Sequence, residues 1–167
     1  SFSNGAAYGD LDNDGDLDLV VNNVNMPCFI YQNKTSEKSD SNYLKIQLQG
    51  SSQNPLGIGA KVRVRTNGRW QEAQHYLSRS FQSAVAPNLL FGLGEATNVE
   101  ELKVIWADQK SQTLRNIAAN QILSVKYEEA TDNYEPNLAE TTPLFEIEEF
   151  SAAIHQENTF NDFDHER

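Results

Sequence analysis

Apolar and polar residues alternate in short runs along most of the chain, which is the pattern of β-strands with one buried face. Helical periodicity is almost absent, and the runs end at turn formers such as Asn67-Gly68, which suits a tight hairpin. Ten candidate strands follow, at residues 6–11, 18–23, 28–33, 43–49, 60–66, 70–77, 88–94, 101–107, 111–116 and 121–128. Ten strands with short connections predict an all-β fold.

Two polar stretches divide the predicted strands into groups. Residues 34–42 (KTSEKSDSN) contain no apolar side chain, and residues 129–143 (EATDNYEPNLAETTP) read as a second linker. We expect residues 129–142 to be mobile. The chain begins and ends abruptly, as a piece of a longer protein would. We therefore predict a short strand–loop–strand unit at residues 1–37, an antiparallel β-sandwich of about seven strands at 43–128, and an acidic linker with a further segment at 129–167.

Charge follows the same divisions. The net charge of -11 consists of -5 over residues 1–37, +5 over residues 43–127 and -11 over residues 128–167, with residues 38–42 neutral. No run approaches the roughly 18 apolar residues of a membrane span, so this chain predicts no direct membrane insertion. The single cysteine, Cys28, excludes an internal disulfide and a CxxC metal site, and its apolar surroundings predict a buried position.

Five aspartates on alternating positions lead into the strand at 18–23: Asp10, Asp12, Asp14, Asp16 and Asp18. Counted from Asp10, carboxylates stand at positions 1, 3, 5 and 9, Gly15 allows a sharp turn at position 6, and Asp16 can offer a backbone carbonyl. A calcium ion takes six to eight such oxygens. An EF-hand would need a glutamate at position 12, where Val21 stands in a strand pattern.

The alternative to calcium is a solvated acidic hairpin without a metal, or a different ion. Repulsion among closely spaced carboxylates argues against a bare loop, because a divalent cation reverses its sign. Magnesium prefers to keep its waters, and transition metals prefer histidine or cysteine ligands, which this loop lacks. Ca²⁺ is therefore the favoured cofactor.

The segment NGAAYGDLDNDGDLDLVVNN resembles an FG-GAP or VCBS repeat, the calcium-loop blade of β-propellers, with the likeness extending over residues 4–33. The resemblance implies that Asp10, Asp12, Asp14 and Asp18 bind calcium through side chains and Asp16 through its carbonyl. A single repeat is present, so it implies a partial propeller blade.

Four landmarks occur in order within residues 43–127: IGAKVRV, LLFGLG, VEELKVIW and NIAANQILSV. With them this segment resembles an ASPIC/UnbV domain, which follows VCBS repeats in proteins such as cartilage acidic protein and its bacterial relatives. The turn ADQKS departs from the Pro-Ser-Gly turn frequent in the family, and the end segment resembles the start of a following repeat. Both resemblances imply a non-catalytic module located outside the cell, in the periplasm or on the outer cell surface.

One further pattern suggests a binding surface. Lys61, Arg63 and Arg65 alternate with apolar residues in one strand, and Arg69 follows the next turn. This candidate anionic-ligand stripe is either a solvated sheet face, which is the more common case, or a groove for a ligand such as an acidic polysaccharide. A third alternative is a docking site for the acidic tail or for a neighbouring acidic blade. Nucleic acid fits poorly, because the chain is acidic and lacks interleaved stacking aromatics.

The motifs of common enzymes are absent: no G-x-S-x-G, phosphate loop or HExxH occurs. We therefore expect a non-catalytic, calcium-binding extracellular or cell-surface interaction module of a larger propeller protein, with a protein or glycan ligand. The alternatives are a carbohydrate-binding module of a glycan-uptake system and, less favoured, a fragment of a polysaccharide-acting hydrolase. Trp70 and Trp106 could stack on a sugar, although tryptophan in such strands is more often core.

Overall fold

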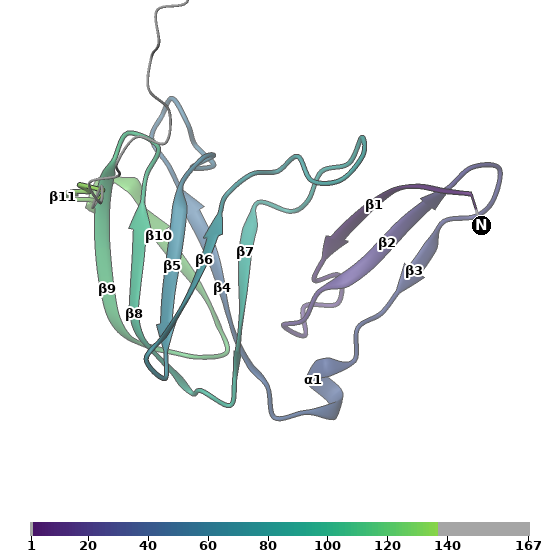
Figure 1. Ribbon diagram of the computed structural model, residues 1–167, viewed down its shortest axis with the longest axis horizontal. Helices are drawn as coiled ribbons and strands as arrows, with labels where there is room; N and C mark the ends of the chain where they lie inside the picture. Colours follow the sequence, from purple (N-terminus) through teal and green to yellow (C-terminus); the bar gives the residue numbers. More distant parts are fainter. Residues whose placement is uncertain (1, 137–167) are drawn as a thin grey trace, which may run out of the picture. The chain divides into compact units, whose positions relative to one another are not determined.

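The structure, a computed structural model, describes residues 2–136, and its regular secondary structure is almost entirely β-strand (Figure 1). The elements are β1 (Ser3–Gly9), β2 (Asp18–Asn23), β3 (Phe29–Tyr31), α1 (Thr35–Lys38), β4 (Asn42–Gln49), β5 (Lys61–Thr66), β6 (Arg69–Gln74), β7 (Asn88–Gly94), β8 (Asn98–Ile105), β9 (Lys110–Ala118), β10 (Gln121–Lys126), the 3₁₀ turn η1 (Tyr127–Glu129) and β11 (Asp132–Asn133). The all-β class is confirmed, and each of the ten predicted strands has a counterpart. The expected following repeat lies outside the described residues, and no helix within them is long and apolar enough to cross a membrane.

The first three strands form an antiparallel meander in the order β1-β2-β3. Its register aligns Tyr8, Leu19 and Tyr31, so these side chains share one face of the sheet. All three are exposed, and Ile30 on the opposite face is 65% exposed. Cys28, which precedes β3, is exposed as well, and the prediction that it is buried is wrong because no second layer covers this part of the sheet among the described residues.

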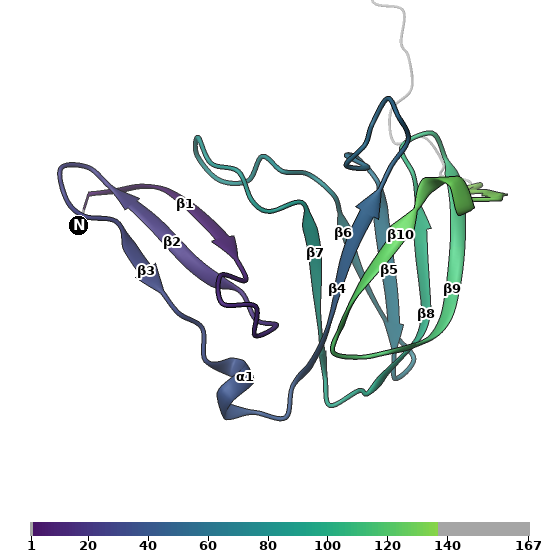
Figure 2. The same ribbon diagram turned by 180° about the vertical axis from the view of Figure 1, so that it is seen from behind.

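The remaining strands form two sheets, in the orders β10-β4-β7 and β11-β9-β8-β5-β6 (Figure 2). Both contribute to one core, in which Leu44 and Ile46 of β4 are buried with Val62 and Val64 of β5 and Leu102 of β8. Apolar residues at every second position supply this core, as strand periodicity requires. The prediction of a purely antiparallel arrangement is wrong for one pair, since β10 pairs with β4 in parallel.

The two predicted linkers contain short ordered elements. Residues 35–38 form α1, a single helical turn. In the second linker, β11 pairs with β9 through Asp132 and Ser111, so the expectation of a mobile segment from residue 129 is wrong as far as Asn133. The polar composition of the two segments did not predict these elements, because contacts with neighbouring parts of the chain hold them rather than apolar residues of their own.

Buried His75 predicts a stability that depends on pH. The residue is 2% exposed, and burial lowers the pKa of the imidazole below the ordinary value of 6.5. A hydrogen bond with the Leu56 backbone opposes this shift, and the positive charge of Arg79 adds to it. The folded state therefore stays neutral where the unfolded chain takes up a proton, so stability is full above the ordinary pKa and falls as the pH drops through and below it. Urea midpoints between about pH 7.5 and pH 5 should show this decline, and His75→Gln should make it shallower. An equal slope in both proteins would contradict the assignment.

Candidate metal centre

Three of the predicted ligands converge in the loop that joins β1 to β2. Asp10, Asp12 and Asp14 each offer a carboxylate oxygen, and these oxygens lie within 4.8 Å of one another. The loop turns back at Asn13 (φ 60°) and Gly15 (φ 93°), conformations that asparagine tolerates and glycine adopts freely. The Asp14 Oδ1 accepts a hydrogen bond from the backbone N–H of Asp16 at 3.1 Å, which tightens the turn.

Asp18 closes the loop instead of joining the cluster of three. Its Oδ2 accepts the backbone N–H of Leu11 at 3.0 Å, and its Oδ1 accepts that of Asn33 at 2.8 Å. With both oxygens used in this way and only 3% exposure, Asp18 ties the start of the loop to the end of β3. Alternating spacing could not distinguish a carboxylate that braces the loop from one that faces a cation.

The short helix α1 fastens the other side of the loop. Ser36 donates its backbone N–H to the Asp16 Oδ2 at 2.9 Å and its hydroxyl to the Asp14 Oδ2 at 2.5 Å. The hydroxyl bond, followed by the backbone N–H of Asp16, holds the pKa of Asp14 below its ordinary value, so this carboxylate is ionised at neutral pH. Ser36 lies in a stretch that reads as a linker, and nothing in the sequence identified its role.

The loop also contacts β4. The Lys45 ammonium forms an ion pair with the Asp10 Oδ2, and the two side chains are only 9% and 4% exposed. The other oxygen of the same carboxylate, Asp10 Oδ1, is buried without a hydrogen-bond partner, as is Asp16 Oδ1. A buried anionic oxygen without a partner is costly, so the cluster has unfilled capacity for a cation.

The chemistry of this donor set fits calcium. The three converging groups are all carboxylate oxygens, the hard ligands that calcium prefers, with no histidine or cysteine among them. Asp12 is exposed and holds one oxygen toward Gln32, whose amide donates to Asp12 Oδ2 at 2.8 Å. Its second oxygen is left available to an ion.

The cationic stripe on β5 is largely paired with acids. The Arg63 Nε lies 3.2 Å from Glu72 Oε2, and the Arg65 Nε lies 3.2 Å from Glu100 Oε2. Both guanidinium groups also lie over the Trp70 ring, at 4.9 and 5.9 Å from its centroid. This pairing favours a solvated sheet face over a groove for an anionic ligand.

The other two members of the predicted stripe differ in position. Lys61 is exposed on the same face of β5 and has no acidic partner among the described residues. Arg69 pairs with Thr66, and because strand faces alternate it lies on the face opposite to Arg63 and Arg65. The structure therefore brings together three of the four residues.

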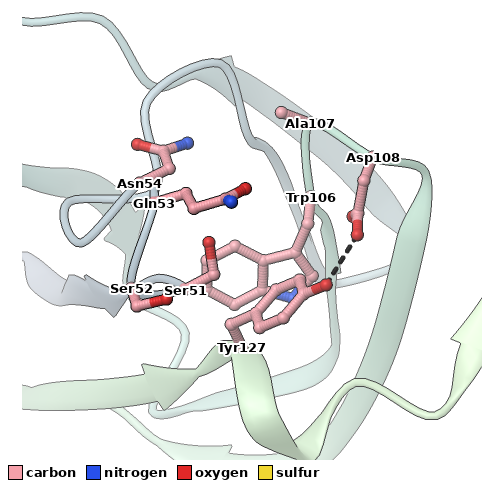
Figure 3. A pocket seen from close by; sticks show the side chains of 8 residues that line it. All are labelled: Ser51, Ser52, Gln53, Asn54, Trp106, Ala107, Asp108 and Tyr127. Atoms are coloured by element: carbon pink, nitrogen blue, oxygen red, sulfur yellow. Dashed lines mark hydrogen bonds between the residues drawn. The ribbon is translucent and has the colours of Figure 1, made fainter.

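A depression of about 280 Å³ lies beside the β4–β5 loop (Figure 3). Tyr127 donates its hydroxyl proton to Asp108 Oδ2 at 2.6 Å, which lowers the pKa of that carboxyl, and its ring meets Trp106 edge to face at 5.5 Å. Trp106 is 3% exposed and belongs to the core. The lining residues are Ser51, Ser52, Gln53, Asn54, Trp106, Ala107, Asp108 and Tyr127. They include a single carboxylate, so this depression offers no carboxylate pair for glycoside cleavage.

The fold and the loop define a β-rich module with a carboxylate cluster on a hairpin. Comparison with known families identifies part of it: residues 50–132 match the family model described as ASPIC and UnbV, so this segment is an ASPIC/UnbV domain. ASPIC/UnbV is a domain of extracellular and surface proteins. No curated protein matches the chain. The match begins at residue 50, after β4, rather than at the expected residue 43, and it continues past the expected end at residue 128 to the first residue of β11. The FG-GAP or VCBS likeness of residues 4–33 stays a prediction.

Proposed function

We propose that the chain is a non-catalytic, calcium-binding interaction module of a larger protein at the cell surface or outside the cell, and that its ligand there is a protein or a glycan. The location is suggested by the ASPIC/UnbV domain. Calcium binding is supported by one observation above all: the Asp10 carboxylate, although buried, leaves Oδ1 without a partner next to two further carboxylates.

In this proposal Asp10, Asp12 and Asp14 hold the ion with their side chains, and Asp16 can add its carbonyl. Asp18 and Ser36 act through hydrogen bonds that keep the loop closed. The ion would neutralise the mutual repulsion of the carboxylates, so that loop order depends on the calcium concentration outside the cell.

The exposed apolar face of the first sheet supports its place in a larger protein. Tyr8, Leu19 and Tyr31 form a row across three strands and are 43%, 40% and 54% exposed. Contiguous apolar surface of this kind normally marks an interface. A neighbouring propeller blade is the partner that the FG-GAP or VCBS likeness implies.

Calorimetric titration with calcium tests the proposal. The unchanged chain should bind calcium, and Asp12→Asn with Asp14→Asn should weaken binding by roughly 100-fold or more, because two of three converging ligands lose their charge. At a calcium concentration of about 100 times the dissociation constant, the unchanged chain should gain about 2.7 kcal/mol in unfolding free energy.

A matched control removes the same charge elsewhere. Asp40→Asn with Glu128→Gln neutralises two exposed acids outside the loop and should leave calcium affinity unchanged. An unchanged chain that produces neither heat nor a shift in melting temperature with calcium would overturn the proposed function.

A further inference from the structure

Lys45 occupies a position where strand alternation predicts a solvent-facing side chain. Its neighbours Leu44 and Ile46 face the core, so Lys45 lies on the opposite face of the sheet, aligned with Leu90 of β7 and Ile122 of β10. A lysine there should be solvated, yet the side chain of Lys45 is only 9% exposed. The loop of residues 10–17 between β1 and β2, here called the aspartate loop, covers it.

Two contacts place the loop on this face of β4. One is the ion pair between Lys45 and Asp10. The other is the close approach of Gly15 to Tyr43, which lies two residues before Lys45 and so on the same face: a Cβ on Gly15 would lie 2.1 Å from Tyr43 Cε1. Leu17 of the loop and Leu90 of β7 line the cavity of about 90 Å³ beside Lys45.

The two oxygens of the Asp10 carboxylate differ in their contacts. Oδ2 is paired with the ammonium group, and Oδ1 is buried without a partner. Among the described residues, Lys45 is the one basic side chain that forms an ion pair with an aspartate of the loop. It is therefore the counter-charge of the loop in the absence of an ion.

A divalent cation bound to the same cluster would share the Asp10 carboxylate with the positively charged ammonium group of Lys45. Like charges at such short range repel strongly in a site shielded from water. The ion also competes with the ammonium group for the electron density of Asp10. Lys45 thus stabilises the loop without calcium and opposes calcium binding.

We propose that Lys45 and calcium compete for Asp10, so that Lys45 sets the calcium affinity of the loop and keeps the loop on β4 when no ion is bound. This inference rests on the proposed function. It adds that Lys45 of β4, which lies outside the loop, controls the affinity of the loop for calcium. A purely structural Lys45 would have the opposite effect, because its removal would loosen the loop and weaken calcium binding.

Calcium titration of Lys45→Met tests whether Lys45 opposes or supports calcium binding. Removal of the charge should tighten calcium binding by about tenfold or more. When a chelator keeps calcium away, the same variant should have a lower melting temperature than the unchanged chain. Calcium should then raise the melting temperature of Lys45→Met by more than it raises that of the unchanged chain. Lys45→Arg keeps the charge and should retain the original affinity.

Lys126→Met serves as the matched control, since it removes one positive charge from an exposed position on β10 and should change neither quantity. Lys45→Gln repeats the test with a polar, neutral side chain. Folding of either neutral variant only in the presence of calcium would support the competition, because the ion then replaces the ammonium group.

The outcomes separate the inference from the function on which it rests. If the unchanged chain binds calcium and Lys45→Met binds it equally or more weakly, competition is refuted while the proposed function stands. Both neutral variants remaining unfolded in saturating calcium would also refute it. If neither the unchanged chain nor Lys45→Met binds calcium, the proposed function itself fails and the inference fails with it.

Discussion

Leu102→Ala should lower the free energy of unfolding by about 2–5 kcal/mol, which is a large part of the total stability of a domain of this size. Leu102 is fully buried in β8, where its register neighbours are Val64 on β5 and Leu114 on β9. Close neighbours on both sides limit the collapse of the surrounding side chains into the space left by the leucine. The loss therefore includes both the burial of the removed atoms and the cost of a cavity.

Urea unfolding with linear extrapolation measures this difference. Ile30→Ala removes a similar side chain that is 65% exposed, and it should cost about 0.5 kcal/mol or less. If Leu102→Ala cost no more than Ile30→Ala, the common core of the two sheets would be in doubt.

Gly15→Ala should be the most damaging small substitution in the aspartate loop. The residue has a φ of 93°, and its new methyl group would overlap the Tyr43 ring, whose nearest atoms would lie 2.1 and 2.2 Å away. The backbone conformation alone costs an alanine about 1–2 kcal/mol. Relief of the overlap requires the ring or the loop to move, which should add about 1–3 kcal/mol.

Gly68→Ala isolates the first of these costs. Gly68 has a φ of 73°, but a Cβ there would meet nothing within 4 Å. Its unfolding free energy should fall by the conformational cost alone, whereas Gly15→Ala should lose more and should also speed amide hydrogen exchange in β1 and β2. Equal losses and equal exchange in the two variants would mean that the loop does not lie on Tyr43.

The sequence predicted the strands well because each depends on local alternation, as the burial of Val62 and Val64 illustrates. It could not predict that β10 would pair in parallel with β4, since nothing local in either strand carries that information. The prediction that Cys28 is buried failed because an apolar run is buried only where another layer covers it, and the run itself does not encode that layer.

The aspartate loop was predictable in position and less so in detail. The alternation of Asp10, Asp12 and Asp14 with a glycine at the turn indicated a convergent cluster, and the structure brings these three together. The partners of the loop could not be predicted, because Lys45 comes from a predicted strand and Ser36 from a segment that reads as a linker. Their roles depend on tertiary contacts that no periodicity encodes.

The parallel pairing of β4 with β10 has a consequence for the order in which the chain can fold. Where β4 begins, the Tyr43 backbone N–H donates to the side chain of Asn120, which lies 77 residues later in the chain. During synthesis one edge of β4 therefore stays uncovered until β10 has been made, near the end of the module. Pairings between such distant segments form slowly. A chain truncated before Gln121 would leave that edge open to pairing with other molecules.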